Sequence, residues 1–259
     1  MLTSFTGSFQ AGRRKAINLA YAAPDFVGSG IQLYYNPEDP DSYSGSGTTI
    51  SDLSGNGFDG TLYNSPTYST NSFLYDGAND YIATPNMYSA FNSTTHFTLE
   101  VWYKPTWTLQ GEGGTVVSEV SNLSFSAWHY ALMEHRKAPF GSLAYDYAGI
   151  WTGSLTAVNP NLTTSGWRQI TLTYNGTNGV SYTNASSPKT VALSRWTPWG
   201  NGGVNSYILV FGHGDTTQQS GAGSNYFKGN IGIVRVYNRA LTATEVLQNY
   251  DGTKAIYGL

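Results

Sequence analysis

Three oxygen-bearing side chains, Asp52, Asn56 and Asp59, lie within a glycine-rich stretch in the first quarter of the chain. Carboxylate and amide oxygens are the ligands that a hard cation such as Ca²⁺ prefers, and glycines let a loop wrap around the ion. The spacing does not match the helix-flanked twelve-residue calcium loop. The same residue types also form ordinary tight turns. The stretch therefore allows two interpretations, a calcium site or a turn.

Carboxyl groups suited to glycoside hydrolysis are sparse. That reaction needs two carboxyl groups on either side of the scissile bond. The alternating segment 96–105 carries a single acid, Glu100, and Glu112, Glu119 and Glu134 are isolated in the sequence. We therefore expect a protein that is not an enzyme. A glycan hydrolase stays open as a less favoured alternative, because glutamates that are distant in the sequence could lie close together in the fold.

Five tryptophans lie in or near expected loops: Trp107, Trp128, Trp151, Trp196 and Trp199. The segment RWTPWGNGG places two of them beside a proline. Indole rings stack on the faces of sugar rings, while neighbouring amides bind hydroxyl groups. The tryptophans indicate a glycan platform, a subunit interface or an aromatic cover over one end of the fold. The three interpretations stay open.

The composition favours strands and turns and excludes several function classes. The chain has 259 residues, of which 11% are charged, with a formal net charge of −3. This balance gives no electrostatic basis for binding nucleic acid. There are no cysteines, so the chain has neither disulfides nor thiolate metal sites. We find no signal peptide or run long enough to span a membrane, and we expect no membrane insertion.

The first thirty residues differ from the rest of the chain. They lack sustained alternation and a helical stripe, and they contain the densest basic cluster. One interpretation is a frayed terminus. The other is an extended arm, residues 1–30, that orders when it docks on a neighbouring subunit or partner protein. Its docking residues would be Phe5, Phe9, Arg13, Arg14 and Lys15.

The remaining residues, 31–259, predict one all-β domain. Short apolar runs recur between turns rich in Gly, Asn and Asp, which is typical of a two-sheet antiparallel sandwich. In the segment 96–105, alternation places four side chains on one face, namely Phe97, Leu99, Val101 and Tyr103. The uninterrupted apolar run 207–211 predicts a strand that is covered on both faces.

The stretch 226–251 predicts a strand, a turn and a short helix. Residues 231–237 are β-branched or aromatic and favour a buried strand. Thr242 and Glu245 have the spacing of a capping box, so a helix should begin there. Gly252 is placed to end the helix in a left-handed cap. Two apolar residues stand at the positions of a hydrophobic staple, Leu241 and Val246.

Five segments together resemble a known family. SDLSGNGFDGTL, FLYDGANDYI, HFTLEVWYKP, GWRQITLTYNG and GNIGIVRVYNRALTATEVLQNY occur in the order seen in laminin G-like domains, closest to their pentraxin-like branch. These domains belong to the concanavalin A-like lectin/glucanase superfamily. The resemblance covers about residues 31–252. It implies a jelly-roll sandwich of two curved antiparallel sheets, with one short helix near the C-terminus.

The segments at the two ends of the domain resemble a narrower group within this family. GIQLYYNPEDPDSYSGSGTTISDLSGNG and LQNYDGTKAIYGL are similar to laminin G-like proteins of tailed bacteriophages. This similarity implies a virion structural protein, as a capsid decoration or attachment component, assembled in the cytoplasm of the bacterial host. Its expected partners are other capsid or tail proteins, a host surface glycan and further copies of itself. The alternative is a carbohydrate-binding module that recognises host surface polysaccharide.

The resemblance also affects the prediction of a calcium site. Calcium is the one cofactor that we consider. In many relatives an Asp follows the Ile of the closing strand and assists a calcium site. In this chain that position is Gly232. The departure weakens the expectation of a metal, although backbone carbonyl groups can still contribute. If calcium binds, the resemblance and the loop composition make Asp52 and Asp80 the leading ligands.

Overall fold

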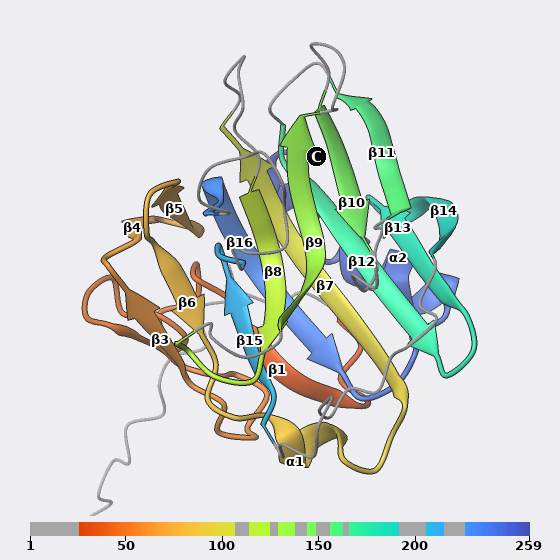
Figure 1. Cartoon of the computed structure of the whole chain (residues 1–259), viewed down its shortest axis with the longest axis horizontal. Helices are drawn as coiled ribbons and strands as arrows, with labels where there is room; N and C mark the ends of the chain where they lie inside the picture. Colours follow the sequence, from red (N-terminus) through yellow and green to blue (C-terminus); the bar gives the residue numbers. More distant parts are fainter. Residues whose placement is uncertain are drawn as a thin grey trace, which may run out of the picture.

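The computed structural model describes residues 26–106, 114–124, 129–137, 144–148, 156–162, 166–191, 206–214 and 226–259. Two antiparallel sheets pack face to face (Figure 1), and we call them sheet A and sheet B. In Figure 1 sheet B lies in front of sheet A, and helix α2 (Ala243–Asp251) lies behind both. This architecture confirms the predicted all-β sandwich with a short helix near the C-terminus.

Sheet A has, in spatial order, the strands β14 (Ser186–Val191), β13 (Gly179–Thr183), β12 (Arg168–Asn175), β7 (His96–Pro105), β16 (Lys228–Tyr237), β5 (Ser72–Asp76) and β4 (Thr67–Ser69). Strand β1 (Ile31–Tyr35) pairs with the second half of β16, beyond β5. Sheet B has β11 (Thr156–Leu162), β10 (Ala144–Ala148), β9 (His129–Lys137), β8 (Gly114–Val120), β15 (Ile208–Phe211), β6 (Tyr81–Ala83), β3 (Gly60–Tyr63) and β2 (Thr49–Ile50).

The main core lies between the sheets. The predicted inward face of β7 is confirmed, since Phe97, Leu99, Val101 and Tyr103 all belong to that core. Strand β15 is buried on both faces, as its apolar run predicted. Its Leu209 and Phe211 face the main core, while Val210 belongs to a separate cluster on the outer face of sheet B.

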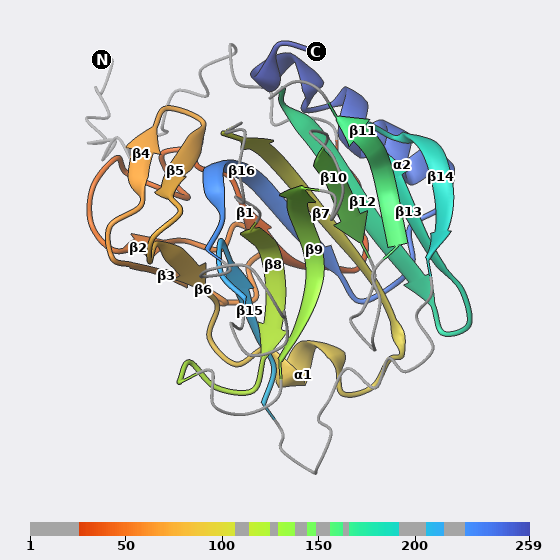
Figure 2. The same cartoon turned by 45° about the horizontal axis from the view of Figure 1, so that its top comes forward.

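The described residues also form three helical segments. The short α1 (Tyr88–Phe91) was not predicted, because a single turn has no room for a recognisable apolar stripe. The 3₁₀ turn η1 (Lys254–Tyr257) follows α2 near the C-terminus, which lies on the outer face of sheet A (Figure 2). None of the helices in the described ranges is both long and apolar enough to cross a membrane.

Helix α2 begins as the sequence predicts. Thr242 Oγ1 accepts a hydrogen bond from Glu245 N at 3.3 Å, and Glu245 Oε2 accepts one from Thr242 N at 2.8 Å. The guanidinium of Arg239 and these capping bonds lower the pKa of Glu245 to about 2. The staple residues Leu241 and Val246 are both buried in one cluster.

The predicted left-handed end of α2 is wrong. Gly252 has φ −67° and ψ −16°, which is right-handed helical geometry. The chain continues through Thr253 into η1, and the left-handed residue is Gly258, with φ 74°. The prediction failed because Thr253 Oγ1 donates to the Asn249 carbonyl at 2.8 Å. That side chain satisfies a free carbonyl group that a left-handed cap would otherwise satisfy.

A buried polar network joins α2 to the outer face of sheet A. Glu100 of β7 and Arg235 of β16 form an ion pair of 3.3 Å, and both side chains are at most 1% exposed. Asn249 of α2 donates from Nδ2 to Glu100 Oε2 at 2.8 Å and to Tyr237 Oη at 3.0 Å. Burial raises the pKa of Glu100, and Arg235 and Asn249 oppose that rise.

The network extends to both ends of the described chain. Thr253 Oγ1 accepts a hydrogen bond from Trp102 Nε1 at 3.0 Å, which places η1 against β7. Val27 N donates to Asn249 Oδ1 at 2.8 Å, and the ring of Phe26 lies 5.4 Å from the Arg235 guanidinium. The end of the predicted arm therefore packs beneath α2. Its proposed docking residues, Phe5, Phe9, Arg13, Arg14 and Lys15, lie outside the described residues.

We predict that Arg235→Met costs about 3–5 kcal/mol of unfolding free energy, because it leaves the buried Glu100 carboxylate without its cation. The double variant Glu100→Leu/Arg235→Met should recover at least half of that loss, since no unpaired charge remains. Urea unfolding of the two single variants and the double variant measures the coupling. A cost of less than about 1 kcal/mol for Arg235→Met would show that the pair does not hold the fold.

Candidate functional site

The predicted calcium ligand Asp52 fixes the conformation of the loop between β2 and β3 through hydrogen bonds. Its Oδ1 accepts hydrogen bonds from the backbone N–H groups of Tyr34 and Ser54, each at 2.9 Å. Its Oδ2 accepts from Ser54 Oγ at 2.7 Å and from Phe58 N at 3.1 Å. Asp59 in turn accepts from Asp52 N at 2.8 Å. The glycine-rich stretch is therefore a connection between β2 and β3 organised by carboxylates.

Asp80 lies in the β5–β6 turn, where its Oδ2 accepts a hydrogen bond from Asp76 N at 3.1 Å. Burial raises the pKa of this carboxyl group. Because Tyr63 pairs with Tyr81, Asp80 lies beside the end of β3, whereas the loop of Asp52 leads into its start. The two carboxylates therefore cannot bind one ion. Within the described ranges no three His, Asp or Glu side chains gather as a metal site requires, and calcium stays a prediction.

Gly232, the position at which the resemblance led us to look for an Asp, has a packing role. It lies in an irregular part of β16, between Ile231 and Val234. A Cβ atom at this position would overlap the hydroxyl group of Tyr257. That hydroxyl accepts a hydrogen bond from Ile233 N at 2.8 Å. A tyrosine of η1 thus occupies the space next to β16 where an aspartate would stand.

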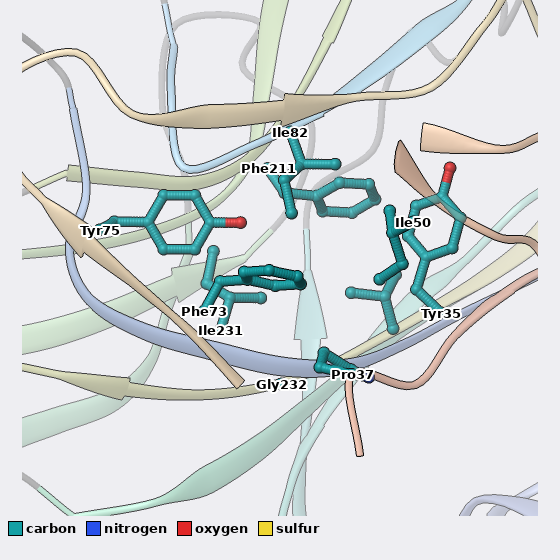
Figure 3. A pocket seen from close by; sticks show the side chains of 10 residues that line it. Tyr35, Pro37, Ile50, Phe73, Tyr75, Ile82, Phe211, Ile231 and Gly232 are labelled. Carbon is teal, nitrogen blue, oxygen red and sulfur yellow. The ribbon is translucent and has the colours of Figure 1, made fainter. Parts of the chain in front are cut away.

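A small cavity between the sheets is lined almost entirely by apolar and aromatic side chains (Figure 3). The Tyr75 hydroxyl points inward among these side chains, and no other described residue hydrogen-bonds to it. Burial raises the pKa of Tyr75, which keeps its phenol protonated. The Tyr35 hydroxyl points away and donates to the Phe58 carbonyl at 2.5 Å. Most of the residues that line the cavity belong to the main hydrophobic core, so the cavity is part of that core.

Among the described glutamates, Glu100 is separated from Glu119 and Glu134. Glu100 belongs to sheet A and is covered by α2, whereas Glu119 and Glu134 belong to strands β8 and β9 of sheet B. Glu112 lies outside the described residues. Glu100 therefore does not face the other two described glutamates.

A row of stacked aromatic rings runs across sheet B. The rings of Tyr63 and Tyr81 stack with centroids 4.5 Å apart and planes 9° apart. His213 lies 5.8 Å beyond Tyr81, and Tyr226 stacks on His213 at 4.0 Å with an interplanar angle of 13°. The three tyrosines are half-buried, while His213 is buried. We call these four residues the aromatic row.

The row is positioned by close backbone contacts at one end of the sandwich. A Cβ atom on Gly114 would overlap the backbone of Phe227, and one on Gly214 would overlap the side chain of Thr115. These glycines let the segments that carry His213 and Tyr226 lie against β8, where Thr115 forms an isolated bridge with Tyr226. The two rings are thereby brought into stacking distance.

The row has the features of a sugar-binding surface. Tyr63 and Tyr81 cover the apolar cluster on the outer face of sheet B. The exposed Asn64 and Asn79 border them, and Asn64 Nδ2 donates to the Asn79 carbonyl at 2.7 Å. Aromatic faces can contact the C–H groups of a sugar while amides bind its hydroxyls. This arrangement suits a neutral polar ligand.

Sequence reasoning did not find the row, because its members come from four separate segments. The only signal was the number of tyrosines next to predicted turns. The tryptophans that were proposed as a glycan platform or interface, Trp128, Trp151, Trp196 and Trp199, lie outside the described residues.

A family model described as the concanavalin A-like lectin/glucanases superfamily matches residues 76–247, which is more than half of the chain. No curated protein sequence matches significantly. Among solved structures, a Trypanosoma rangeli sialidase in complex with 2,3-difluorosialic acid is similar, with a TM-score of 0.59 and 14% identity. The alignment covers 88% of this chain and 33% of the sialidase, so the chain spans about a third of that enzyme's length.

Domain 4 of AbnA, an extracellular arabinanase from Geobacillus stearothermophilus solved in complex with arabinotriose, has a TM-score of 0.52 and 15% identity. The alignment covers 85% of this chain and 98% of that domain. At these identities the likenesses establish the fold alone.

We predict that Gly232→Ala destabilises the protein by about 1–3 kcal/mol, because the added methyl group displaces Tyr257 from β16. Gly166→Ala is the matched control, since a Cβ atom there meets no other atom within 4 Å. Thermal and urea unfolding of both variants measure the difference. Equal stability of the two variants would contradict the assigned packing role.

Proposed function

The chain belongs to the concanavalin A-like lectin/glucanase superfamily, and we propose that it is a carbohydrate-binding module without catalytic activity. The observation that carries this proposal is the half-exposed aromatic row with its bordering amides. Tyrosine is well suited to such contacts, because its ring is rigid and its hydroxyl stays hydrated. Burial raises the pKa of both Tyr81 and Tyr226, so their hydroxyls remain protonated donors at neutral pH.

The placement of the two ends of the described domain supports this assignment. Phe26 and η1 both pack on the outer face of sheet A. The aromatic row belongs to the outer face of sheet B, across the full thickness of the sandwich. A module tethered through either end would therefore present the row away from its tether.

The comparisons are consistent with a glycan as the ligand class. The AbnA domain, which this fold covers almost completely, is described in complex with arabinotriose. That observation belongs to the arabinanase domain. For this chain it supports the choice of sugars as the first ligands to test.

We predict that Tyr63→Ala and Tyr226→Ala each weaken glycan binding by roughly tenfold or more, because each removes a stacking face from the row. Tyr182→Ala is the control, since Tyr182 is also half-buried but packs at the outer face of sheet A. A glycan array followed by calorimetry on the best ligand measures the affinities. A silent array, or an equal loss in Tyr182→Ala, would count against the proposal. Release of reducing sugar from a bound polysaccharide would instead identify a hydrolase.

We also propose, from the sequence resemblance of the two flanks, that the module is displayed on a bacteriophage virion as a decoration or attachment component. This proposal rests on the sequence alone. Display in many copies would strengthen weak glycan contacts through avidity.

Deletion of residues 1–25 should then abolish incorporation into particles and leave the sandwich folded, because Phe26 and Val27 would remain in place beneath α2. Mass spectrometry of purified particles and circular dichroism of the isolated protein measure the two effects. Unchanged incorporation would refute anchoring by the arm.

A further inference from the structure

The aromatic row ends at Tyr63, and one face of this last ring has no aromatic ring against it. Tyr63 stacks on Tyr81 through its other face, and no further described ring contacts it. Tyr81 and His213, by contrast, each contact two rings of the row. Strand β2 pairs only with Gly60 and Thr61 of β3, so the half-buried Tyr63 lies beyond the end of that strand. Tyr63 is therefore the ring at this end of the row on which a sugar can stack.

Two connections between the sheets run beside Tyr63. One leads from β3 of sheet B to β4 of sheet A and begins at Asn64, and the other leads from β5 of sheet A to β6 of sheet B and contains Asn79. The four strands lie together at one side of the sandwich (Figures 1 and 2). Asn64 Nδ2 donates to the Asn79 carbonyl at 2.7 Å. This hydrogen bond joins the two connections next to the ring of Tyr63.

The first of these connections has an uncommon backbone. Asn64 has φ 60° and Ser65 has φ 74°, in the left-handed region that residues with a Cβ atom rarely adopt. Both residues are exposed, so burial in the core does not determine their side chains. A glycine at position 64 would adopt the same backbone with less strain. The amide of Asn64 in this strained position points to a role beyond the turn.

The amides of Asn64 and Asn79 keep hydrogen-bonding capacity for a ligand. Among the described residues, none donates to Asn64 Oδ1, and the side-chain amide of Asn79 has no hydrogen-bond partner. Both side chains are exposed. An amide oxygen accepts a hydrogen bond from a sugar hydroxyl, and an amide nitrogen donates one. Acceptors and donors suited to neighbouring hydroxyl groups therefore lie beside the ring of Tyr63.

The charges of the second connection do not favour an acidic sugar. Asp76 is the last residue of β5, and Asp80 directly precedes β6. Lys228 of the neighbouring strand β16 pairs with Asp76. The connection thus carries two carboxyl groups beside this one cation, so a negatively charged sugar would gain no net attraction. A neutral sugar avoids that disadvantage.

We propose that Tyr63, Asn64 and Asn79 form the subsite that recognises a neutral sugar residue, and that Asn64 determines its specificity. This inference rests on the proposed function, because it names the class of sugar that the aromatic row takes. The ring of Tyr63 contacts the C–H groups on one face of the sugar, and the two amides bind two neighbouring hydroxyl groups. A sugar that lacks one of these hydroxyls leaves an amide without its partner and binds less tightly.

The first test compares two glycine variants of the same connection in the full chain. Asn64→Gly removes the amide and keeps the left-handed backbone, whereas Ser65→Gly keeps the amide and is the matched control. The probe is the tightest neutral oligosaccharide from an array that includes arabinotriose. Calorimetry should show about tenfold weaker binding for Asn64→Gly and unchanged binding for Ser65→Gly. Asn79→Ala keeps the carbonyl group that accepts from Asn64 and should also weaken binding.

Thermal unfolding of the same variants separates recognition from a role in the turn. The Tm of Asn64→Gly should stay within about 3 °C of the wild-type value, because glycine adopts this backbone without strain. A lower Tm of Asn64→Gly together with unchanged affinity would make Asn64 a residue of the turn alone and would overturn the inference.

The second test compares array glycans that carry a uronic acid with their carboxyl-reduced, neutral counterparts. The neutral forms should bind more tightly, and tighter binding of the acidic forms would overturn the assignment of a neutral sugar. Equal affinities of Asn64→Gly and Ser65→Gly, with the effect of Tyr63→Ala intact, would overturn this inference and leave the proposed function standing. An array on which no glycan binds would refute both the subsite and the carbohydrate-binding module.

Discussion

The buried ion pair between Glu100 and Arg235 is the interaction on which the rest of the structure depends. It joins the two central strands of sheet A, β7 and β16, on the face away from the main core. Asn249 connects the pair to α2 and to the backbone of Val27. A charge pair buried this deeply stabilises a fold only when its remaining hydrogen bonds are satisfied. Asn249 of α2 donates to Glu100 and Thr253 accepts from Arg235, which leaves Arg235 Nε as the one atom of the pair without a hydrogen-bond partner among the described residues. The helix and the segment before β1 cover the pair, so the outer face of sheet A is closed by both ends of the described domain.

That closure leaves the two outer faces of the sandwich with different roles. Sheet A is covered by α2, η1 and the residues before β1, whose side chains stack on Trp102 and Tyr34. Sheet B carries the aromatic row, whose tyrosines remain half-exposed.

Local sequence patterns predicted much of the fold. Features that depend on contacts between distant residues could not be predicted. The alternation in 96–105 determines strand β7, and the capping box at Thr242 determines the start of α2. Both signals lie within a few residues of sequence, so both elements were predicted correctly. Gly252 was misread because its geometry depends on the Thr253 side chain, which is also bound by the distant Trp102. The aromatic row is assembled from four separate segments. No sequence spacing encodes such convergence, so the row could not be derived from the chain alone.

The most direct measurement of the central claim, that the aromatic row binds sugar, is an NMR titration of protein carrying isotope-labelled tyrosine rings with the tightest glycan from an array. We predict that the ring signals of Tyr63, Tyr81 and Tyr226 shift in proportion to occupancy, because a stacked sugar changes their magnetic environment. The rings of Tyr182 and Tyr250, which pack at the outer face of sheet A, should stay unchanged. Shifts confined to those two rings, with the row unaffected, would contradict the account.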